Sequence, residues 1–274
     1  MIHERIKLEM PGSEIYANVV TYVISHSEEI GIDKRPLVIV CPGGGYCFTS
    51  EREAEMFALK WNAYGYHAMV LWYSVRPAVY PAALLELAKA VTIAREHAEE
   101  WHIDVDKIFI QGSSAGGHLA ASYGMFWNRS FLADELHTET AMLKPAGMIL
   151  SYPVITSGEY AHRESFENLL GDAYEDQKEE LSLEKQVSDD TPPAFVWTTN
   201  EDDLVPAENS ILLALAMRKK KIPVELHMYM KGGHGLALAS ELTMGNAGEN
   251  IEPSCQGWFE LAYRWTQEMI KADK

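Results

Sequence analysis

Gly112, Ser114 and Gly116 form a Gly-x-Ser-x-Gly sequence between a short apolar run and an Ala-rich segment. This order predicts a strand, a sharp turn and a helix, with Ser114 at the tip of the turn. Glycine on each side leaves room where a Cβ would clash with a serine held on a strained turn. The N–H groups that open the following helix would face a developing negative charge. The pattern therefore indicates an activated serine that attacks an acyl carbon; the alternative is a plain turn.

A hydroxyl is a weak nucleophile, so it needs a base within hydrogen-bond reach and a partner that orients this base. Of the ten histidines, His234 combines a late position with flanking glycines that free its loop. Three adjacent carboxylates precede it. Asp202 is favoured as the orienting acid because it stands three residues before Val205, at the opening of the next predicted helix; Asp203 and Glu201 remain alternatives. Ser113 is the alternative nucleophile, but it is not at the centre of the motif.

A tract of three glycines, residues 43–45, follows the apolar run 36–41. Such a tract allows several backbone N–H groups to face one point. A phosphate loop would continue with Gly-Lys-Ser/Thr, whereas this chain continues with Tyr46 and Cys47. The dinucleotide fingerprint Gly-x-Gly-x-x-Gly is absent as well. We therefore predict an oxyanion hole formed by the N–H groups of Gly44, Gly45 and Ala115, the residue after the serine.

Apolar runs alternate with segments of helical spacing along the whole chain. This alternation favours a largely parallel sheet with helices on both faces, in a single α/β domain over residues 1–274. Residues 154–192 are charged and have no strand pattern, and they are interpreted as a mostly helical lid over the sheet. Strands are predicted at 14–24, 36–41, 66–73, the run before Gly112, 147–152 and 194–198, with an edge strand at 224–229. Helices are predicted at 51–64, at 82–100, in the segment after Ser114, from Pro206 and from Pro253.

The chain is acidic, with a formal net charge of −17, so nucleic acid and anionic membrane surfaces are poor candidates as partners. Cys41, Cys47 and Cys255 have no framework spacing, which favours a reducing compartment. Neither a signal peptide nor a membrane-spanning run is recognisable, and the expected location is the cytoplasm. No metal site is expected, because the cysteines are scattered and no histidine pair has helical ligand spacing.

The chain resembles the α/β-hydrolases of the carbohydrate acetyl esterase type, the bacterial acetyl-xylan-esterase-like or "xylanase B-like" proteins. The likeness is carried by residues 41–46, 80–82, 112–118, 151–155 and 161–171, by Asp202 with 205–206, and by 232–236. It implies Ser114, Asp202 and His234 as a catalytic triad, without a cofactor, acting on small acyl groups carried by sugars. Pro42 stands where the wider lipase-like group has a histidine, so substrate preferences of that group are not carried over.

The expected function is a serine esterase that removes acetyl groups from xylo-oligosaccharides or other sugars. A general short-chain carboxylesterase is the main alternative; a peptidase of the same fold and a non-catalytic binding scaffold are others. Tyr46 and Tyr80 lie near predicted strand ends, where they would stack on a sugar or pack against the lid. The oligomeric state is left open, with a homo-oligomer as one option.

Overall fold

One eight-stranded sheet organises the computed structural model, which describes residues 1–272. The strand order is β1-β2-β4-β3-β5-β6-β7-β8. All neighbours from β4 to β8 pair in parallel, whereas β1 and β2 add an antiparallel edge. The strands are β1 (Arg5–Lys7), β2 (Asn18–Tyr22), β3 (Arg35–Cys41), β4 (His67–Trp72), β5 (Ile103–Ser113), β6 (Gly147–Ser151), β7 (Ala194–Thr199) and β8 (Val224–Tyr229).

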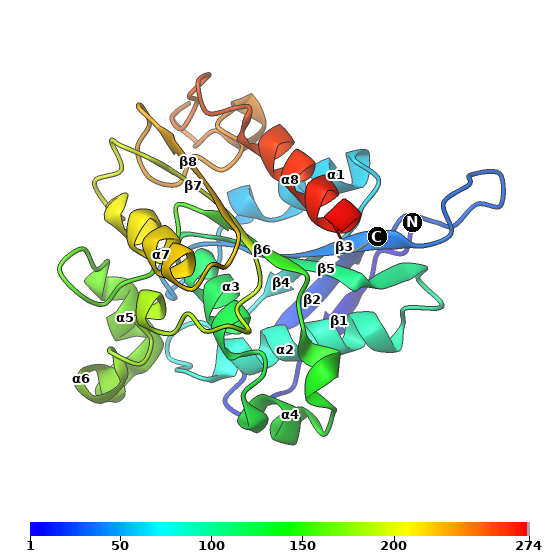
Figure 1. The fold of residues 1–274 in the computed structure, drawn as a ribbon, viewed down its shortest axis with the longest axis horizontal. Helices are drawn as coiled ribbons and strands as arrows, with labels where there is room; N and C mark the ends of the chain where they lie inside the picture. The colour runs from blue at the N-terminus through cyan, green and yellow to red at the C-terminus, as the bar shows by residue number, and fades with distance from the viewer. Residues whose placement is uncertain (273–274) are drawn as a thin grey trace.

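Helices cover both faces of this sheet (Figure 1). The central strands need cover on both sides, because every residue of β3 from Leu37 to Cys41 is buried. One face carries α1 and α8, whose aromatic side chains form a layer: the Trp61 and Phe259 rings lie 4.7 Å apart. The other face packs against α2, α3, α4 and α7. The helices are α1 (Glu55–Ala63), α2 (Ala82–Glu96), α3 (Ser114–Phe126), α4 (Ser130–Leu136), α5 (Arg163–Leu170), α6 (Tyr174–Gln177), α7 (Glu208–Lys219) and α8 (Trp258–Ala272).

Several predicted boundaries shift. The strand predicted over 14–24 begins at Asn18, because the residues before it form a turn. The helices predicted from Pro206 and Pro253 begin later, at Glu208 and Trp258, because the residues that follow each proline form a turn first. The prediction of β8 as an edge strand is confirmed, since β8 ends the sheet order.

Residues 154–192, called the cap below, are only partly helical, so the expectation of a mostly helical segment is wrong. The cap contains α5, the four-residue α6 and short 3-10 turns, joined by irregular chain. Helix α5 ends at Leu170 because Gly171, which follows it, has a positive φ. Side chains such as Phe166 and Leu181 are nonetheless buried against the body.

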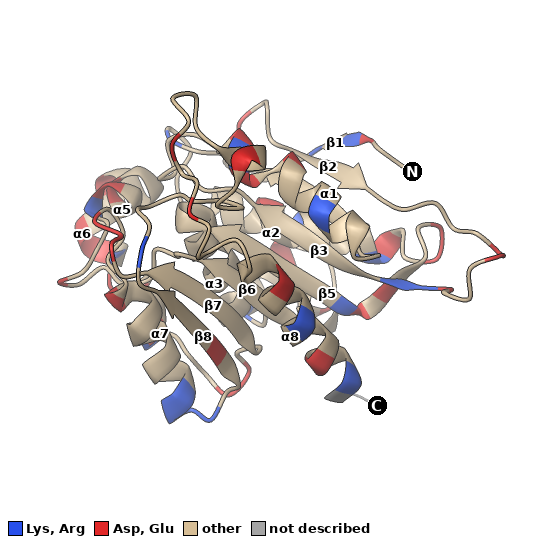
Figure 2. Cartoon of the chain, turned by 90° about the horizontal axis from the view of Figure 1, so that it is seen from above, with Lys and Arg blue, Asp and Glu red and all other residues tan. Residues whose placement is uncertain are grey.

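Hydrogen bonds fasten the cap to the body near the motif serine. The Val154 N–H donates to the Ser114 carbonyl at 3.0 Å. The Asn209 side chain on α7 accepts from the N–H groups of Ile155 and Thr156 at 2.9 and 3.1 Å. Figures 1 and 2 both show α5 and α6 together at one end of the sheet. The cap is therefore hydrogen-bonded to the body at this end of the molecule.

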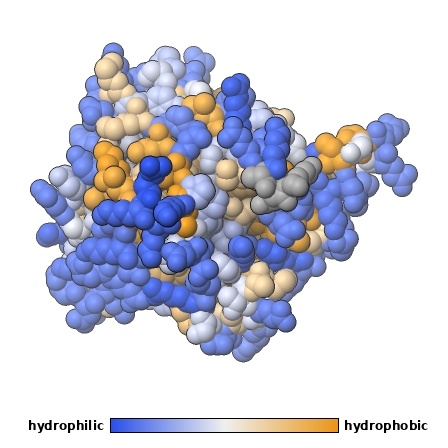
Figure 3. All heavy atoms as spheres, in the orientation of Figure 1, coloured by the Kyte–Doolittle hydropathy of each residue, from blue (hydrophilic) through white to orange (hydrophobic). Residues whose placement is uncertain are grey.

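Charge lies mainly on the helices, the loops and the ends of strands (Figure 2), and β4, β6 and β7 carry no Lys, Arg, Asp or Glu. Apolar residues reach the surface over the region of β7, β8 and α7 (Figure 3), where Leu204, Leu215, Met228 and Met230 are exposed. Within residues 1–272, no helix has the length and apolar composition that a membrane span requires.

Candidate active site

The turn between β5 and α3 holds Ser114 in a left-handed conformation, with φ +53°. This is a strained position for a residue with a Cβ, and it lifts the serine out of the strand at its carboxyl end. A Cβ built on Gly112 would lie 2.0 Å from the Gly116 carbonyl oxygen. One on Gly116 would lie 2.1 Å from the Cys41 oxygen. The turn thus requires both glycines, as the motif predicts.

Replacing Gly116 by Ala is expected to cost more than about 3 kcal/mol of the free energy of unfolding, because the new methyl group meets backbone atoms that cannot rotate away. Urea unfolding, or the yield of soluble protein, measures this. Gly31→Ala is the matched control: it adds the same methyl group at an exposed position with nothing within 4 Å. Equal stabilities of the two variants would contradict the steric reading of the turn.

Three predicted residues form one hydrogen-bonded chain. His234 Nε2 lies 2.8 Å from Ser114 Oγ, and His234 Nδ1 lies 2.7 Å from Asp202 Oδ2. A carboxylate only accepts, so the Nδ1 proton points to Asp202 and Nε2 is left to accept the serine proton. The Asp202 side chain is buried, while that of His234 is 14% exposed. His234 is therefore placed to act as a base toward the Ser114 hydroxyl.

The turn after β7 decides between the three adjacent carboxylates. Asp202 Oδ1 accepts from the N–H groups of Leu204 and Val205, which turns the other oxygen toward His234. Glu201 is exposed and accepts from the Gly232 N–H, and Asp203 is exposed. The structure therefore brings Asp202, and neither neighbour, to the histidine. Ser113, the alternative serine, is 1% exposed and lies outside this chain.

Hydrogen bonds to its carbonyl groups hold the glycine tract that follows β3. The Gly43 oxygen accepts from the Ser50 N–H at 2.9 Å, and the Gly44 oxygen from the Cys47 N–H at 3.0 Å. In a planar peptide the N–H points opposite to the carbonyl, so the N–H groups of Gly44 and Gly45 point away from these partners. Within residues 1–272 neither N–H has a hydrogen-bond acceptor.

The third predicted donor belongs to α3. Ala115 lies in the first turn of this helix, where N–H groups have no acceptor within the helix. A Cβ built on Gly43 would lie 3.0 Å from the Ser114 Cβ, which shows how closely the glycine tract approaches the serine. The two segments together can bind an oxyanion beside Ser114.

A buried hydrogen-bond network that sequence reasoning missed supports these loops. Glu53, 4% exposed, accepts from the Gly43 N–H at 2.7 Å and from the Tyr152 hydroxyl at 2.5 Å. The Tyr152 oxygen in turn accepts from the Ala237 N–H at 2.9 Å, and its ring packs edge-on against His234. The network ties the glycine tract to the histidine loop. In the sequence Glu53 is one of several charged residues in an ordinary helical pattern, so no signal singled it out.

Of the two expectations for Tyr46, the structure shows the packed side chain. Its side chain is 2% exposed, and its hydroxyl lies 3.0 Å from His118 Nδ1 inside the core. His118 Nε2 lies 2.9 Å from the Leu181 carbonyl of the cap, so it carries the proton and Nδ1 accepts from Tyr46. The Tyr46 ring turns inward, where its hydroxyl finds a buried acceptor in His118. Tyr80 is half-buried. Its burial, and to a smaller extent the nearby Glu180 carboxylate, raise the pKa of its hydroxyl to about 12.

Burial lowers the pKa of His118 to about 4, and likewise that of His67. In the unfolded chain both would titrate near 6.5, so between these values the unfolded chain binds more protons. The free energy of unfolding is therefore expected to fall as the pH drops from about 6.5 to about 4, by up to about 1.4 kcal/mol per pH unit for each histidine. Urea unfolding of wild type and His118→Gln from pH 7 to pH 4.5 measures this. The variant keeps the His67 contribution and should show the shallower slope; parallel slopes would contradict the assignment.

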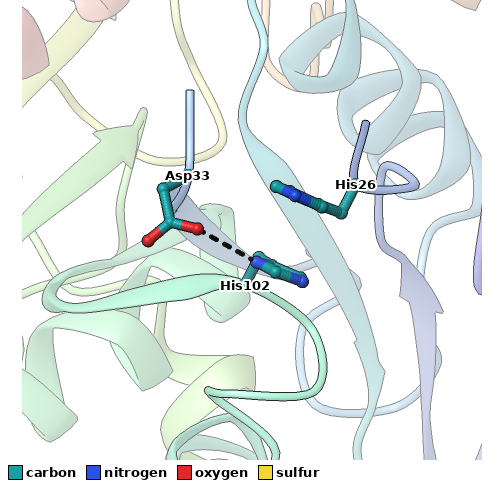
Figure 4. Close-up of side chains that lie close together, drawn as sticks. All are labelled: His26, Asp33 and His102. Carbon is teal, nitrogen blue, oxygen red and sulfur yellow. Dashed lines mark ion pairs between the residues drawn. The ribbon is translucent and has the colours of Figure 1, made fainter. Parts of the chain in front are cut away.

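A second cluster of potential ligands lies away from this site. His26, Asp33 and His102 place one donor atom each within 4.8 Å of one another (Figure 4). The two imidazole rings are stacked, with centroids 3.8 Å apart and planes inclined by 4°. A metal ion lies in the plane of each imidazole that binds it, and two parallel planes cannot both contain one ion. As these side chains lie, they form a stacked pair beside an acid.

The chain also matches known proteins. The family model described as BD-FAE matches residues 25–217, which is more than half of the sequence. The chain belongs to the BD-FAE family. Relatives include endo-1,4-beta-xylanase B of Butyrivibrio fibrisolvens, 38% identical over 79% of this chain, and acetylxylan esterase of Xylanibacter ruminicola, 30% identical over 74%. The chain spans only 34% and 41% of the length of these two relatives.

A solved structure extends the likeness over nearly the whole chain. The acetyl ester-xyloside bifunctional hydrolase from Caldicellulosiruptor lactoaceticus is 33% identical, with a TM-score of 0.82, over 97% of this chain and 96% of its own. Other similar structures are α/β hydrolases and carboxylesterases, so the predicted fold class is confirmed. The resemblance to acetyl-xylan-esterase-like and "xylanase B-like" proteins is confirmed as well.

Proposed function

We propose that this chain is a serine carboxylesterase that hydrolyses acetyl esters of sugars through an acyl-enzyme on Ser114. The hydrogen-bonded chain from Ser114 through His234 to Asp202 is the observation that carries the proposal. The free N–H groups at the glycine tract support it, because they supply what a serine esterase needs beside its nucleophile. The names of relatives that act on acetyl esters or xylan support the choice of substrate.

The geometry allows each step to be assigned. His234 Nε2 takes the Ser114 proton as Oγ bonds to the acetyl carbon, and the N–H groups of Gly44, Gly45 and Ala115 bind the resulting oxyanion. Asp202 stabilises the imidazolium. The imidazolium then gives its proton to the sugar oxygen as the carbon–oxygen bond breaks. Water, deprotonated by His234, attacks the acetyl-enzyme, and acetate leaves as the serine regains its proton. The proposed reaction needs no cofactor or metal.

The cap and Tyr80 are proposed to shape the sugar side of the pocket. Tyr80 borders the cap, where its N–H donates to the Leu169 carbonyl at 2.8 Å. A half-buried phenol at this border offers a ring face and a hydroxyl, which suits a saccharide. Short acetylated oligosaccharides are the proposed form of the substrate, and the cytoplasm is the proposed location.

Acetate release from acetylated xylo-oligosaccharides, run beside p-nitrophenyl acetate and p-nitrophenyl octanoate, tests the proposal. We expect turnover of the oligosaccharide and the nitrophenyl acetate, with little hydrolysis of the octanoate. Hydrolysis of both nitrophenyl esters without acetate release from the sugar would leave a general short-chain carboxylesterase. A chain that neither turns over an ester nor reacts with a fluorophosphonate would be a binding scaffold, and the proposal would be wrong.

A further inference from the structure

Helix α5 of the cap reaches directly into the glycine tract through one side chain. Asn168 is 3% exposed, and its Nδ2 donates to the Gly45 carbonyl at 2.9 Å. Its Oδ1 accepts from Arg76 Nη1 at 3.1 Å. Because an amide has one accepting and one donating end, these two partners fix which way the Asn168 side chain points. Within residues 1–272 the Gly45 carbonyl has no other donor.

The Gly45 carbonyl matters because the preceding peptides carry the free N–H groups. The carbonyls of Gly43 and Gly44 are held by backbone N–H groups within their own loop. The next peptide, which begins with the Gly45 carbonyl, is held from outside by the cap. The Arg76 N–H holds the following Tyr46 carbonyl at 2.8 Å. Gly45 itself has φ +61°, a conformation that glycine leaves easily when nothing restrains it.

We propose that Asn168 is a positioning residue for the oxyanion hole, and that α5 is thereby part of the catalytic apparatus. The inference rests on the proposed esterase function of Ser114. The Gly45 N–H lies in the peptide of the Gly44 carbonyl, which is held within the loop, whereas the Asn168 amide holds the next peptide, on the other side of the Gly45 Cα. Without the Asn168 amide, Gly45 is restrained on one side only, and the peptide that carries its N–H is free to tilt. The donor is still present but misdirected, so binding of the ground-state ester is spared while stabilisation of the transition state is lost.

Asn168→Ala and Asn168→Asp test this with p-nitrophenyl acetate as substrate. Both remove the N–H donor, and the Asp variant keeps the size of the side chain. Loss of an oxyanion donor typically costs about 10²–10³ in kcat, and a misdirected one should cost about 10- to 100-fold. We expect this fall in kcat with KM within about threefold of wild type. Affinity for a short alkyl trifluoromethyl ketone, which forms a tetrahedral serine adduct, should fall by the same factor as kcat.

Two further variants calibrate the result. Arg76→Ala leaves the Asn168 amide in place but without its orienting partner, and a smaller fall in kcat is expected. Glu167→Ala changes an exposed neighbour on the same helix and should behave as wild type. Circular dichroism at the assay temperature restricts the comparison to folded protein, and Asn168→Asp serves if the Ala variant fails to fold.

Each outcome bears on the inference. A kcat within threefold of wild type in both Asn168 variants, or a rise in KM with kcat unchanged, would overturn the positioning role. Ser114→Ala, assayed alongside, separates this from failure of the proposed function: if it is inactive while the Asn168 variants are normal, only the role of Asn168 is wrong. An active Ser114→Ala would instead remove the esterase proposal itself.

Discussion

Ser114→Ala is expected to lower kcat for p-nitrophenyl acetate by roughly 10⁶-fold, to the rate that positioned donors alone provide. The hydroxyl at 2.8 Å from His234 Nε2 is the only part removed, and the methyl group of alanine fits where the serine Cβ already lies. KM and thermal stability should therefore change little. The initial rate of nitrophenol release measures the effect, with protein purified to exclude traces of other esterases.

Two controls sharpen this result. Ser113→Ala changes the buried neighbour outside the hydrogen-bonded chain and should keep most of the activity. A fluorophosphonate should label wild type at a single serine, found at Ser114 by peptide mass, and should not label Ser114→Ala. Retention of more than about a tenth of the activity by Ser114→Ala would exclude it as the nucleophile, since triad serines contribute several orders of magnitude.

Asp202→Asn should lower kcat by about 10⁴-fold with the fold intact. The amide is the same size, and its oxygen can still accept from Leu204 and Val205. Its NH₂ group would then face His234 Nδ1, so the imidazole must place its proton on Nε2, and it cannot accept the serine proton. Steady-state kinetics at pH 7–8 measure the loss.

The neighbouring carboxylates provide matched controls for that prediction. Asp203→Asn and Glu201→Gln make the same chemical change at exposed side chains of the same turn. Glu201 accepts from the Gly232 N–H, so a fall of a few-fold is expected there, and less at Asp203. A loss at Asp203→Asn as large as that at Asp202→Asn would contradict the orienting role given to Asp202.

The sequence predicts local features of this molecule well. The Gly-x-Ser-x-Gly turn follows from steric rules that act within a few residues, and the three glycines follow from the same rules. Asp202 could be favoured over Asp203 because it stands three residues before Val205, at the opening of the next predicted helix; the structure shows that its carboxylate accepts from the N–H groups of this turn. The alternation of apolar runs and helices then placed these loops at one end of a parallel sheet.

The contacts of two supporting side chains with distant segments could not be predicted in this way. Glu53 meets Tyr152 across 99 residues, and Asn168 meets Gly45 across 123. Nothing in either segment alone indicates its partner. The two fates of Tyr46 stayed open for a related reason: an aromatic residue after a strand has the same local pattern whether its ring turns outward or, as here, toward a buried histidine.

The glycine tract contains three residues of one type that meet three separate demands. Gly43 gives its N–H to Glu53 and so adds no donor to the site; it must be small because a Cβ would lie 2.7 Å from that carboxylate. Gly44 has φ +130°, which residues with a side chain rarely adopt. Gly45 has φ +61°, and its carbonyl accepts from Asn168 of the cap. The first glycine therefore anchors the tract to Glu53, the second makes its sharp turn, and the third connects it to the cap. A run of three identical residues, which composition alone would suggest to be a flexible hinge, here consists of three positions with different structural roles.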